Sequence, residues 1–507
     1  MSFLSIHIQA GDRFSSPLVQ KNEDDFFSIA NGDGSIQIRL TRRNAYPRTY
    51  CHRRDDGSYA FGYGTLDDMD SEFLECVICP DGHLSIRRDS FGTLPLFYGN
   101  DDVLFAASNE YSDLQAVLHC TISERGLLDA LAVEMPMETT FAEQIKVLWE
   151  DLSLIRETNG VISISRQSNK LQLPKIDPED FNGLFNKYLD DFIATRLDGQ
   201  LVAFEASGGL DSATLHQYYA QKNPGNPLWM ASLLHRDEFQ LSQEDKIKRL
   251  VDVTASHFVY QALDSPRFQF PLARMLITGN YIPTYFEKTY LEPTLSYVEK
   301  LADAGVQIIC TGVGGDELFS NAVIETRNAE TRQAQLRLPA FTTALFHDEY
   351  LAARSESSKL KTARVQSASY ASLCNNLYIN HGIWPVSPFL SPILYQIIKQ
   401  LPIHFRANKN ILRAYHQAHG FIPEIYNPVQ NEDFLSFFKD CFCAGGYDVG
   451  IQQLAQNAVS VHRGYVAEDV LLEMYERTKT EYSDRDAFEI YMWILTEINL
   501  QSLSLKA

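Results

Sequence analysis

The feature that most constrains this chain is the sequence Ser-Gly-Gly-Leu-Asp-Ser at residues 207–212, because of what lies on either side of it. Residues 201–206 form an apolar run typical of a short strand, and residues 212–222 have the composition of a helix that begins directly after the glycines. A strand that ends in two glycines and continues as a helix leaves several backbone N–H groups unpaired and close together. Such a turn binds anions, and we interpret it as a cradle for a pyrophosphate group.

The side chains of this turn suit the same ligand. The hydroxyls of Ser207 and Ser212 can donate hydrogen bonds to phosphate oxygens, and the carboxylate of Asp211 can bind Mg2+. A glycine pair alone is equally well explained by a tight turn, but this whole sequence between a strand and a helix is harder to explain that way. The chain contains no Gly-x-x-x-x-Gly-Lys-Ser/Thr sequence, which excludes the commoner nucleotide-binding loop.

A second glycine-rich turn follows another predicted strand. Residues 306–310 are a short apolar run, and residues 312–317 read Gly-Val-Gly-Gly-Asp-Glu. Ligands of parallel sheets lie at the carboxyl ends of the strands. If the strand at 201–206 is a neighbour of this one, Asp211 and Asp316 converge and can share a Mg2+ ion with phosphate oxygens. The alternative explanation of the acidic pair is a helix N-terminus, where carboxylates are favourable.

The two turns together resemble the asparagine synthetase superfamily, a branch of the PP-loop ATP pyrophosphatases. These enzymes cleave ATP between the α and β phosphates to adenylate a substrate carboxylate, and the superfamily includes asparagine synthetases, β-lactam and carbapenam synthetases and lasso-peptide cyclases. The similarity continues at Pro-Phe-Leu (388–390) and at Lys-Asn-Ile-Leu-Arg (409–413). The resemblance implies a carbon–nitrogen ligase that uses ATP and Mg2+.

The resemblance also implies roles for individual residues. Asp211 and Asp316 would hold the magnesium ion, and Asp316 and Glu317 would be the catalytic carboxylates. The strand end at Ser232 and Leu233 would contact the adenine. The full set of ATP-binding residues implied in this way is Ser207, Gly208, Gly209, Leu210, Asp211, Ser212, Ser232, Leu233, Gly312, Val313, Gly314 and Gly315.

The first 174 residues read as short strands separated by turns. Residues 88–98 and 104–108 resemble the core of the glutamine amidotransferase domain that precedes the PP-loop in asparagine synthetases. Such domains use an N-terminal cysteine as nucleophile, but position 2 here is Ser2 and the first cysteine is Cys51. We therefore expect an Ntn-hydrolase-like αββα fold that has lost glutaminase activity. The predicted strands are 4–8, 35–40, 75–79, 84–87, 96–98 and 103–107, with turns at 55–57 and 81–82.

The pattern changes near residue 175, where Asp177 and Pro178 are typical of a helix start. Beyond it, predicted strands and helices alternate, which indicates a parallel sheet with helices on both faces. We predict an α/β protein with a glutamine-amidotransferase-like domain at 1–174 and a doubly wound synthetase domain at 175–507, whose C-terminal part is helical. The elements predicted in the second domain are strands at 228–233, 258–262 and 306–310 and helices beginning at 178, 242, 291 and 487.

Composition excludes several classes of function. The formal net charge of −21 argues against a general binder of nucleic acids or anionic membranes. No apolar run approaches the roughly 20 residues of a transmembrane helix, the N-terminus lacks a secretion signal, and the eight cysteines are scattered. We expect a cytoplasmic protein whose partners are a small-molecule or peptide carboxylate and, for assembly, a second copy of the chain or biosynthetic proteins.

Two departures from the superfamily pattern matter. Val313 stands where asparagine synthetases usually have Glu and β-lactam synthetases have a Tyr of an acid/base dyad, and valine cannot transfer a proton. The superfamily also has a lysine, beyond the segment 409–413, that meets the pyrophosphate, whereas no lysine or arginine occurs here between Arg413 and Lys439. Either another base, such as Lys439 or Arg406, reaches the site, or the phosphoryl step is impaired. Loss of such a cation costs roughly 2–4 kcal/mol of transition-state stabilisation.

These observations favour an AMP-forming amide ligase that uses ammonia or a substrate amine instead of glutamine, as in natural-product ring closure such as lasso-peptide cyclisation. No residue selects a peptide substrate. An asparagine synthetase that uses ammonia is the nearest alternative. A non-catalytic ATP-binding scaffold is the third, because the N-terminal cysteine and the expected lysine are missing although both turns and their carboxylates are intact.

Overall fold

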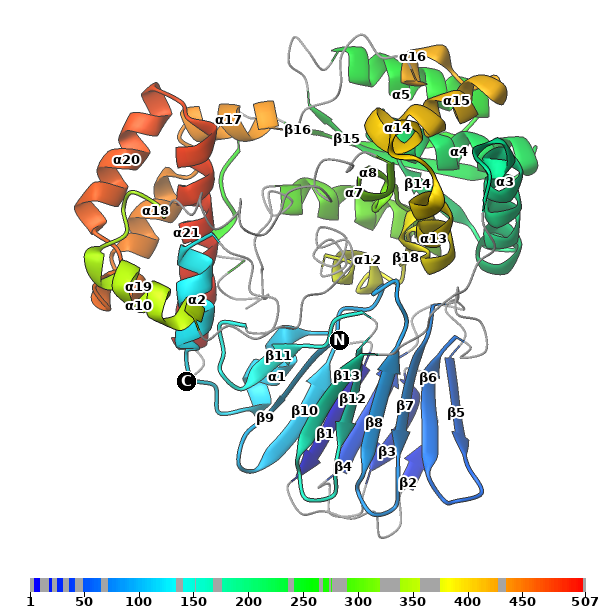
Figure 1. The fold of residues 1–507 in the computed structure, drawn as a ribbon. Coiled ribbons are helices and arrows are strands. Elements are labelled where there is room, and N and C mark those ends of the chain that lie inside the picture. The colour runs from blue at the N-terminus through cyan, green and yellow to red at the C-terminus, as the bar shows by residue number, and fades with distance from the viewer. Residues whose placement is uncertain are drawn as a thin grey trace.

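The computed structural model describes residues 4–9, 18–20, 25–30, 36–41, 49–64, 72–133, 140–150, 152–166, 176–235, 241–263, 268–272, 275, 290–319, 338–355, 374–426 and 435–504. These residues form three parts (Figure 1): a sandwich of two sheets from the N-terminal third, a parallel sheet with its helices, and a group of helices formed mainly by the C-terminal residues. The expected combination of a sheet-rich N-terminal part, a parallel sheet and a helical C-terminal part is confirmed.

The described strands of the sandwich form two antiparallel sheets that share one core. Side chains alternate as expected for half-buried strands, so that Leu4, Ile6 and Ile8 point inward and pack in the same cluster as Leu84 and Ile86 of the other sheet. All six predicted strands are present. The seven-stranded sheet has the order β11 (Ile145–Val147), β9 (Phe97–Asn100), β10 (Leu104–Ser108), β1 (Leu4–Gln9), β4 (Ile36–Thr41), β3 (Asp25–Ala30) and β2 (Leu18–Gln20). The six-stranded sheet has the order β13 (Ile162–Arg166), β12 (Leu152–Arg156), β8 (Leu84–Arg88), β7 (Leu74–Ile78), β6 (Tyr59–Tyr63) and β5 (Thr49–Arg53).

Both predicted hairpin turns are also confirmed. Gly57 and Gly82 adopt φ values of 85° and 89° between β5 and β6 and between β7 and β8. This left-handed conformation is open to glycine at little cost. Helices α1 (Tyr111–Val117) and α2 (Glu124–Leu131) follow the strand β10.

The parallel sheet contains five strands among the described residues. They lie in the order β16 (His257–Leu263), β15 (Leu228–His235), β14 (Val202–Glu205), β17 (Ile308–Cys310) and β18 (Trp384–Val386), and every neighbouring pair is parallel. The predicted adjacency of the strands that precede the two glycine turns is therefore correct. Strands β15 and β16 lie on one side of β14, and the later strands β17 and β18 lie on its other side. Ligands of open α/β sheets bind at such a switch point, here between β14 and β17.

Helices cover both faces of this sheet, as predicted. On one face, the Phe204 ring contacts His216 and Tyr219 of α4 (Leu210–Lys222). On the other face, Ala203 and Ile309 pack in one cluster with residues of α7 (Leu291–Asp303). The other described helices near the sheet are α3 (Phe181–Phe192), α5 (Leu241–Thr254), α8 (Gly315–Phe319), α12 (Asn376–Ile379), α13 (Pro392–Gln400), α14 (Ile403–Arg406), α15 (Asn410–Ala418) and α16 (Pro423–Tyr426).

The start of α3 differs in detail from the prediction. A single 3-10 turn, Pro178–Asp180, precedes the α-helix, and the Asp177 side chain makes no capping hydrogen bond. Short irregular helices also occur at Ile193–Leu197, Pro388–Leu390 and Ala407–Lys409. The last of these precedes α15 and belongs to the candidate site.

The third part is helical and is organised around the long helix α21 (Asp484–Ser504), which extends the helix predicted from residue 487 and is buried along most of its length. It packs against α2 of the N-terminal third, as the adjacent helices in Figure 1 also show. The other helices of this part are α10 (Ala344–Ser355), α17 (Leu435–Cys443), α18 (Asp448–Ala455), α19 (Val459–His462) and α20 (Glu468–Thr480).

Polar contacts join the sandwich to the parallel sheet. The Trp384 indole N–H donates to Glu72 Oε2 at 2.9 Å, and Asn376 Nδ2 donates to the Asn109 carbonyl at 2.6 Å. Ser2 and the predicted domain boundary at 174/175 lie outside the described residues. The loss of glutaminase activity and the position of the boundary therefore remain predictions.

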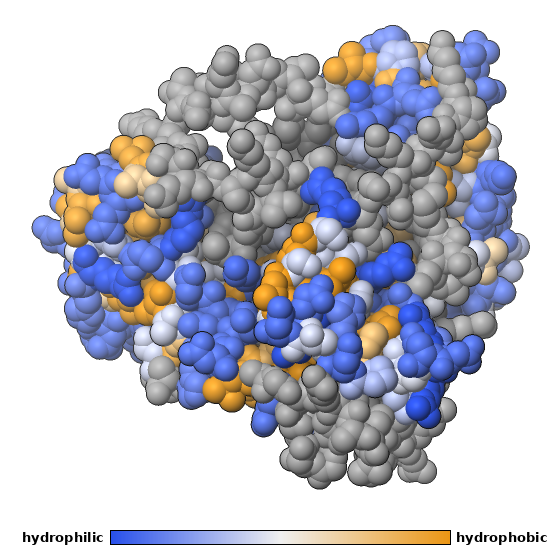
Figure 2. All heavy atoms as spheres, turned by 60° about the horizontal axis from the view of Figure 1, so that its bottom comes forward, coloured by the Kyte–Doolittle hydropathy of each residue, from blue (hydrophilic) through white to orange (hydrophobic). Residues whose placement is uncertain are grey.

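Hydrophilic side chains make up most of the coloured surface on the face that Figure 2 shows, with small hydrophobic patches between them. Within the described residues, no helix combines the length and the apolar character that crossing a bilayer requires.

Candidate functional site

The first glycine turn joins β14 to α4 and presents two hydroxyls. The turn needs glycine at Gly208, where φ is +82°. Ser207 Oγ accepts a hydrogen bond from the Gly209 N–H at 3.1 Å and shares a hydrogen bond of 3.4 Å with Ser212 Oγ. The Gln243 side chain of α5 donates to the Ser207 carbonyl at 2.8 Å and so fixes the turn from the neighbouring helix.

The second glycine turn, between β17 and α8, packs directly on the first. A Cβ atom at Gly312 would come within 3.0 Å of the Ser212 nitrogen, and one at Gly315 would lie only 2.4 Å from Asp211 Cγ. A larger residue at Gly315 would therefore displace Asp211, and one at Gly312 would press on the backbone of the first turn. The close approach of the two turns thus favours glycine at both positions, most strongly at Gly315.

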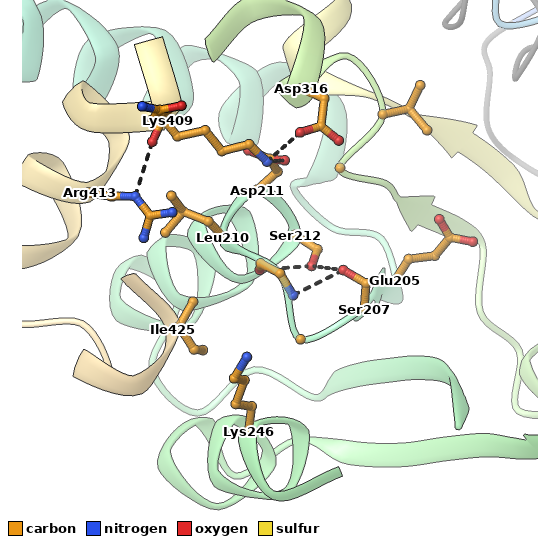
Figure 3. Close-up of a pocket in the computed structure, with 15 residues that line it drawn as sticks. Glu205, Ser207, Leu210, Asp211, Ser212, Lys246, Asp316, Lys409, Arg413 and Ile425 are labelled. Atoms are coloured by element: carbon orange, nitrogen blue, oxygen red, sulfur yellow. Dashed lines mark hydrogen bonds and ion pairs between the residues drawn. The ribbon is translucent and has the colours of Figure 1, made fainter. Parts of the chain in front are cut away.

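The two turns are joined by a lysine. Lys409 Nζ donates to Asp211 Oδ2 and to Asp316 Oδ1, the latter at 2.7 Å, as Figure 3 shows. Lys409 and Asp211 are mostly buried, whereas Asp316 is 73% exposed. Lysine and carboxylates from three different segments thus converge on one small volume at the switch point of the sheet.

This finding bears on the missing cation. The sequence left open whether another base, such as Lys439 or Arg406, reaches the site or the phosphoryl step is impaired. In the structure, the cation between the two carboxylates is Lys409. Lys439 Nζ instead lies 5.5 Å from the centre of the Tyr482 ring, in the helical C-terminal part. The sequence signal at Lys409 was present in the segment 409–413, but nothing in it indicated which way the side chain would point.

Lys409 is held in place by an unusual backbone. Asn408 and Lys409 adopt left-handed φ values of 56° and 58°, which cost roughly 1–2 kcal/mol for a residue with a Cβ atom. Arg413 Nε stabilises this conformation by donating to the Asn408 carbonyl at 3.1 Å. Helix α15 is anchored on α4 by a 2.6 Å hydrogen bond between His416 Nε2 and Thr214 Oγ1. Strained backbone that is fixed by its surroundings is often found at functional sites.

The charge on Lys409 is stable. Burial alone would lower the pKa of its ammonium group, but the charges and hydrogen bonds of Asp211 and Asp316 outweigh burial and raise the pKa above its ordinary value. Lys409 is therefore positively charged at every pH at which the protein is expected to work.

Both turns and Lys409 line one cavity of about 590 Å³, which is within the range of small-ligand sites. Its lining residues are Glu205, Ser207, Gly208, Gly209, Leu210, Asp211, Ser212, Lys246, Gly312, Val313, Asp316, Asn408, Lys409, Arg413 and Ile425. In the close-up, Lys409 and Arg413 lie on the opposite side of the first turn from Lys246 (Figure 3).

No protein-family model and no curated protein matches the sequence. Solved structures similar to this chain include the U34-tRNA thiolase NcsA from Methanococcus maripaludis with its [4Fe-4S] cluster, at 10% identity and a TM-score of 0.26, covering 60% of this chain and 82% of that one. Another is the NH3-dependent NAD synthetase from Campylobacter jejuni, at 13% identity and a TM-score of 0.21, covering 41% and 97%.

A third similar structure is the glutamine phosphoribosylpyrophosphate amidotransferase from B. subtilis, at 10% identity and a TM-score of 0.19, covering 84% of this chain and 90% of that one. TM-scores of this size carry no argument about activity. The function is therefore inferred from the geometry of the cavity.

Most of the residues predicted from the sequence line the cavity, but some do not. Ser232 and Leu233, predicted to contact adenine, are not among the lining residues, and the Ser232 hydroxyl donates to the Ala206 carbonyl at 2.6 Å. Gly314 faces Phe389 and Leu390. Gly315 is also absent from the lining residues, although it packs on Asp211. The side chain of Glu317 lies outside the described residues.

Sequence reasoning missed several residues that line the cavity. Glu205 ends β14, where the sequence predicts only the end of a strand, and Lys246 lies on α5. Neither belongs to a motif, so no sequence signal distinguished them from ordinary strand or helix residues. The other residues that were not predicted as site residues are Asn408, Lys409, Arg413 and Ile425.

The donor set fits a magnesium ion. Asp211 and Asp316 both contact one ammonium group, so their carboxylates are close enough to share a cation, and carboxylate oxygens suit Mg2+. No group of three or more His, Cys, Asp or Glu side chains able to hold a metal occurs in the described part of the chain. The remaining ligands would have to be phosphate oxygens and water, as is usual for magnesium bound with a nucleotide.

Proposed function

We propose that this protein is an AMP-forming amide ligase, in which ATP activates a substrate carboxylate and an amine then takes the place of AMP. The observation that carries the proposal is the convergence of both glycine turns and Lys409 on one cavity at the switch point of the parallel sheet. A simple tight turn at residues 207–212 would explain neither the buried lysine nor the close packing of Gly315 on Asp211.

In this proposal, the backbone N–H groups and hydroxyls of residues 207–212 bind the β and γ phosphates of ATP. Asp211 and Asp316 hold Mg2+, which supplies positive charge to the phosphates when bound. Lys409 then exchanges its carboxylate partners for phosphate oxygens and stabilises the negative charge that develops on pyrophosphate. The substrate carboxylate attacks the α-phosphorus, the bond to pyrophosphate breaks, and the acyl-adenylate stays in the cavity.

The amine donor is proposed to be ammonia or an amine of the substrate, and not glutamine, because Ser2 replaces the cysteine that glutaminases of this type require. The carboxylate is a small molecule or a peptide, and lasso-peptide cyclisation is one reaction of this kind. Val313 lines the cavity between the glycines and offers no proton donor, so any proton transfer must use another group.

A non-catalytic ATP-binding protein is the second candidate. It is favoured by one observation: Lys409 already forms ion pairs with both Asp211 and Asp316, which would stabilise the site as a structural element. The two candidates differ in turnover, because only a ligase releases pyrophosphate in response to a carboxylic acid.

The test is release of pyrophosphate from Mg-ATP in the presence of a panel of carboxylic acids that includes aspartate, other amino acids and peptides, with ammonium as amine donor. We expect at least one acid to stimulate release, and Asp211→Ala to abolish it. Asp448→Ala is a matched control, because Asp448 also accepts hydrogen bonds from a lysine, Lys479, but lies in the helical C-terminal part. ATP binding without release for any acid would support the scaffold instead. Release in Asp211→Ala equal to that of the unmodified protein would contradict the site.

A further inference from the structure

A carboxylate with two tyrosine partners lies at the edge of the same cavity and has no role in the proposal so far. Glu205 Oε1 accepts hydrogen bonds from the Tyr297 hydroxyl at 2.9 Å and from the Tyr378 hydroxyl. The two hydroxyls are also 2.8 Å from each other. The three residues come from β14, α7 and α12, which are distant in sequence and meet only in the folded chain.

The surroundings of this cluster are apolar. Tyr297 and Tyr378 are buried in the core cluster between the sheet and α7, together with Ala203 and Ile309. Burial raises the pKa of the Glu205 carboxyl, while the hydrogen bonds from the two tyrosines oppose this effect. Burying a charged carboxylate at this position costs free energy unless a partner compensates the charge.

The described part of the chain supplies no cation to this carboxylate. None of the described lysine, arginine or histidine side chains forms an ion pair or hydrogen bond with Glu205, and the causes of its raised pKa include no positive charge. A glutamine could accept the two tyrosine hydrogen bonds equally well. The negative charge is therefore left without an internal explanation, which points to a ligand that carries positive charge.

Glu205 can reach such a ligand because it lines the cavity together with Ser207 and Val313. Both tyrosines bond to Oε1, and no described residue donates to Oε2. In Figure 3 the carboxylate points away from Asp211, Asp316 and Lys409. A ligand at Glu205 would therefore occupy a different part of the cavity from the phosphates.

We propose that Glu205, positioned by Tyr297 and Tyr378, binds the protonated primary amine or ammonium ion that acts as nucleophile in the amide ligation. This inference rests on the proposed function for the reaction, but the binding site itself does not. An ammonium group donates to Oε2 and is neutralised there. It transfers one proton to Glu205, and the lone pair that becomes free attacks the carbonyl carbon of the acyl-adenylate.

The remaining steps balance the reaction. The new C–N bond forms as the C–O bond to AMP breaks, and AMP leaves with that electron pair. The nitrogen loses its second proton to water, and Glu205 also returns its proton to water. Val313 cannot take part in proton transfer, and Glu205 is the one carboxylate that lines the described cavity apart from the metal-binding carboxylates Asp211 and Asp316.

The first experiment measures binding without ATP. Methylammonium is titrated against the full chain at pH 7.5 and followed by saturation-transfer NMR, with tetramethylammonium as a probe that has the same charge but no N–H donor. Glu205→Gln keeps an acceptor for both tyrosines and removes only the charge. Glu497→Gln is the matched control, because Glu497 is also buried and accepts backbone hydrogen bonds, at 2.8 and 2.9 Å, far from the cavity in α21.

We expect methylammonium to bind the unmodified chain and Glu497→Gln equally, and to bind Glu205→Gln at least tenfold more weakly. Tetramethylammonium should not bind at residue 205 in the unmodified chain, in Glu497→Gln or in Glu205→Gln. Equal binding of methylammonium by Glu205→Gln, with the same melting temperature as the unmodified chain, would overturn the inference. If Glu205→Gln fails to fold, Tyr378→Phe provides a second test, because it keeps the charge and removes one positioning donor. Tyr378→Phe should bind methylammonium more weakly than the unmodified chain, and unchanged binding by a folded Tyr378→Phe chain would count against the positioning of Glu205.

The second experiment separates this inference from the proposed function. With a carboxylic acid that stimulates pyrophosphate release, hydroxylamine is offered in place of the amine. Hydroxylamine is neutral at pH 7.5 and needs no base, so Glu205→Gln should form hydroxamate at the normal rate while its amide formation from ammonium falls at least 100-fold. Equal loss of both products would overturn the role of Glu205. Binding of methylammonium through Glu205 in a chain that never releases pyrophosphate would leave the amine site standing and reject the ligase.

Discussion

Lys409 donates a hydrogen bond to Asp316 across 2.7 Å, which connects the turn before α15 to the second glycine turn. The same ammonium group also contacts Asp211 in the first turn. One cation therefore joins three segments that the sequence places far apart. Its position between two carboxylates indicates how the cavity is kept intact before a nucleotide and its metal ion enter.

The replacement Lys409→Met tests this connection. It keeps most of the length of the side chain and removes the charge, so the phosphates lose a donor and Asp211 loses its contact with the ammonium group. We expect the affinity for Mg-ATP, measured by isothermal titration calorimetry, to fall about tenfold or more, since a hydrogen bond to a charged group contributes about 1.5–3 kcal/mol. Lys479→Met is the matched control, because Lys479 also lies between two carboxylates, Asp448 and Glu476. Unchanged affinity in Lys409→Met would contradict the role given to this lysine.

The close packing of the two turns gives a second prediction. Gly315→Ala would place a methyl group 2.4 Å from Asp211 Cγ, so the turns must separate and Asp211 must move. We expect Mg-ATP binding to be lost, together with a lower melting temperature. Gly183→Ala is the comparison, because a Cβ atom at Gly183 in α3 meets nothing within 4 Å and alanine favours a helix by about 1 kcal/mol over glycine. Gly183→Ala should keep full binding, and equal binding by Gly315→Ala would be inconsistent with the geometry.

These two sites show how much of the structure the sequence allowed us to predict. The strand–turn–helix at residues 207–212 and the adjacency of β14 and β17 follow from local patterns and from the rules of parallel sheets. Gly312 and Gly315 were assigned to the cavity from their motif. Their stronger reason, the contact with the first turn, depends on three-dimensional packing that no local pattern contains.

Lys409 and Glu205 were not predicted for a related reason. The direction of the Lys409 side chain depends on two left-handed residues and on the docking of α15 against α4. The role of Glu205 depends on tyrosines from two helices that follow much later in the chain. Contacts of this kind between distant segments have no periodic signature, whereas strands, helices and glycine turns do.

The joint between the sandwich and the parallel sheet gives a prediction about pH. Burial raises the pKa of Glu72 to about 7, although Arg196 lies 3.4 Å away and opposes the shift. A carboxyl whose pKa is higher in the folded than in the unfolded chain favours folding below the unfolded pKa of about 4.5, and this contribution is lost as pH rises through about 7.

The free energy of unfolding should therefore contain a contribution from Glu72 that decreases between about pH 4.5 and pH 7. Glu72→Gln keeps an acceptor for the Trp384 N–H and cannot ionise, so this part of the pH dependence should disappear. Urea denaturation at several pH values, followed by tryptophan fluorescence, measures the difference. Parallel pH profiles for Glu72→Gln and the unmodified chain would show that Glu72 does not titrate in this range.

The central claim is that both glycine turns and Lys409 serve one bound triphosphate and its metal ion. The most direct measurement is a crystal structure with a non-hydrolysable ATP analogue and Mn2+ in place of Mg2+, in which anomalous scattering locates the metal. We predict a metal peak in contact with the carboxylates of both Asp211 and Asp316, and a Lys409 ammonium group that has turned to the phosphate oxygens. A nucleotide bound elsewhere, or a Lys409 that still bridges the two carboxylates with the nucleotide present, would contradict the claim.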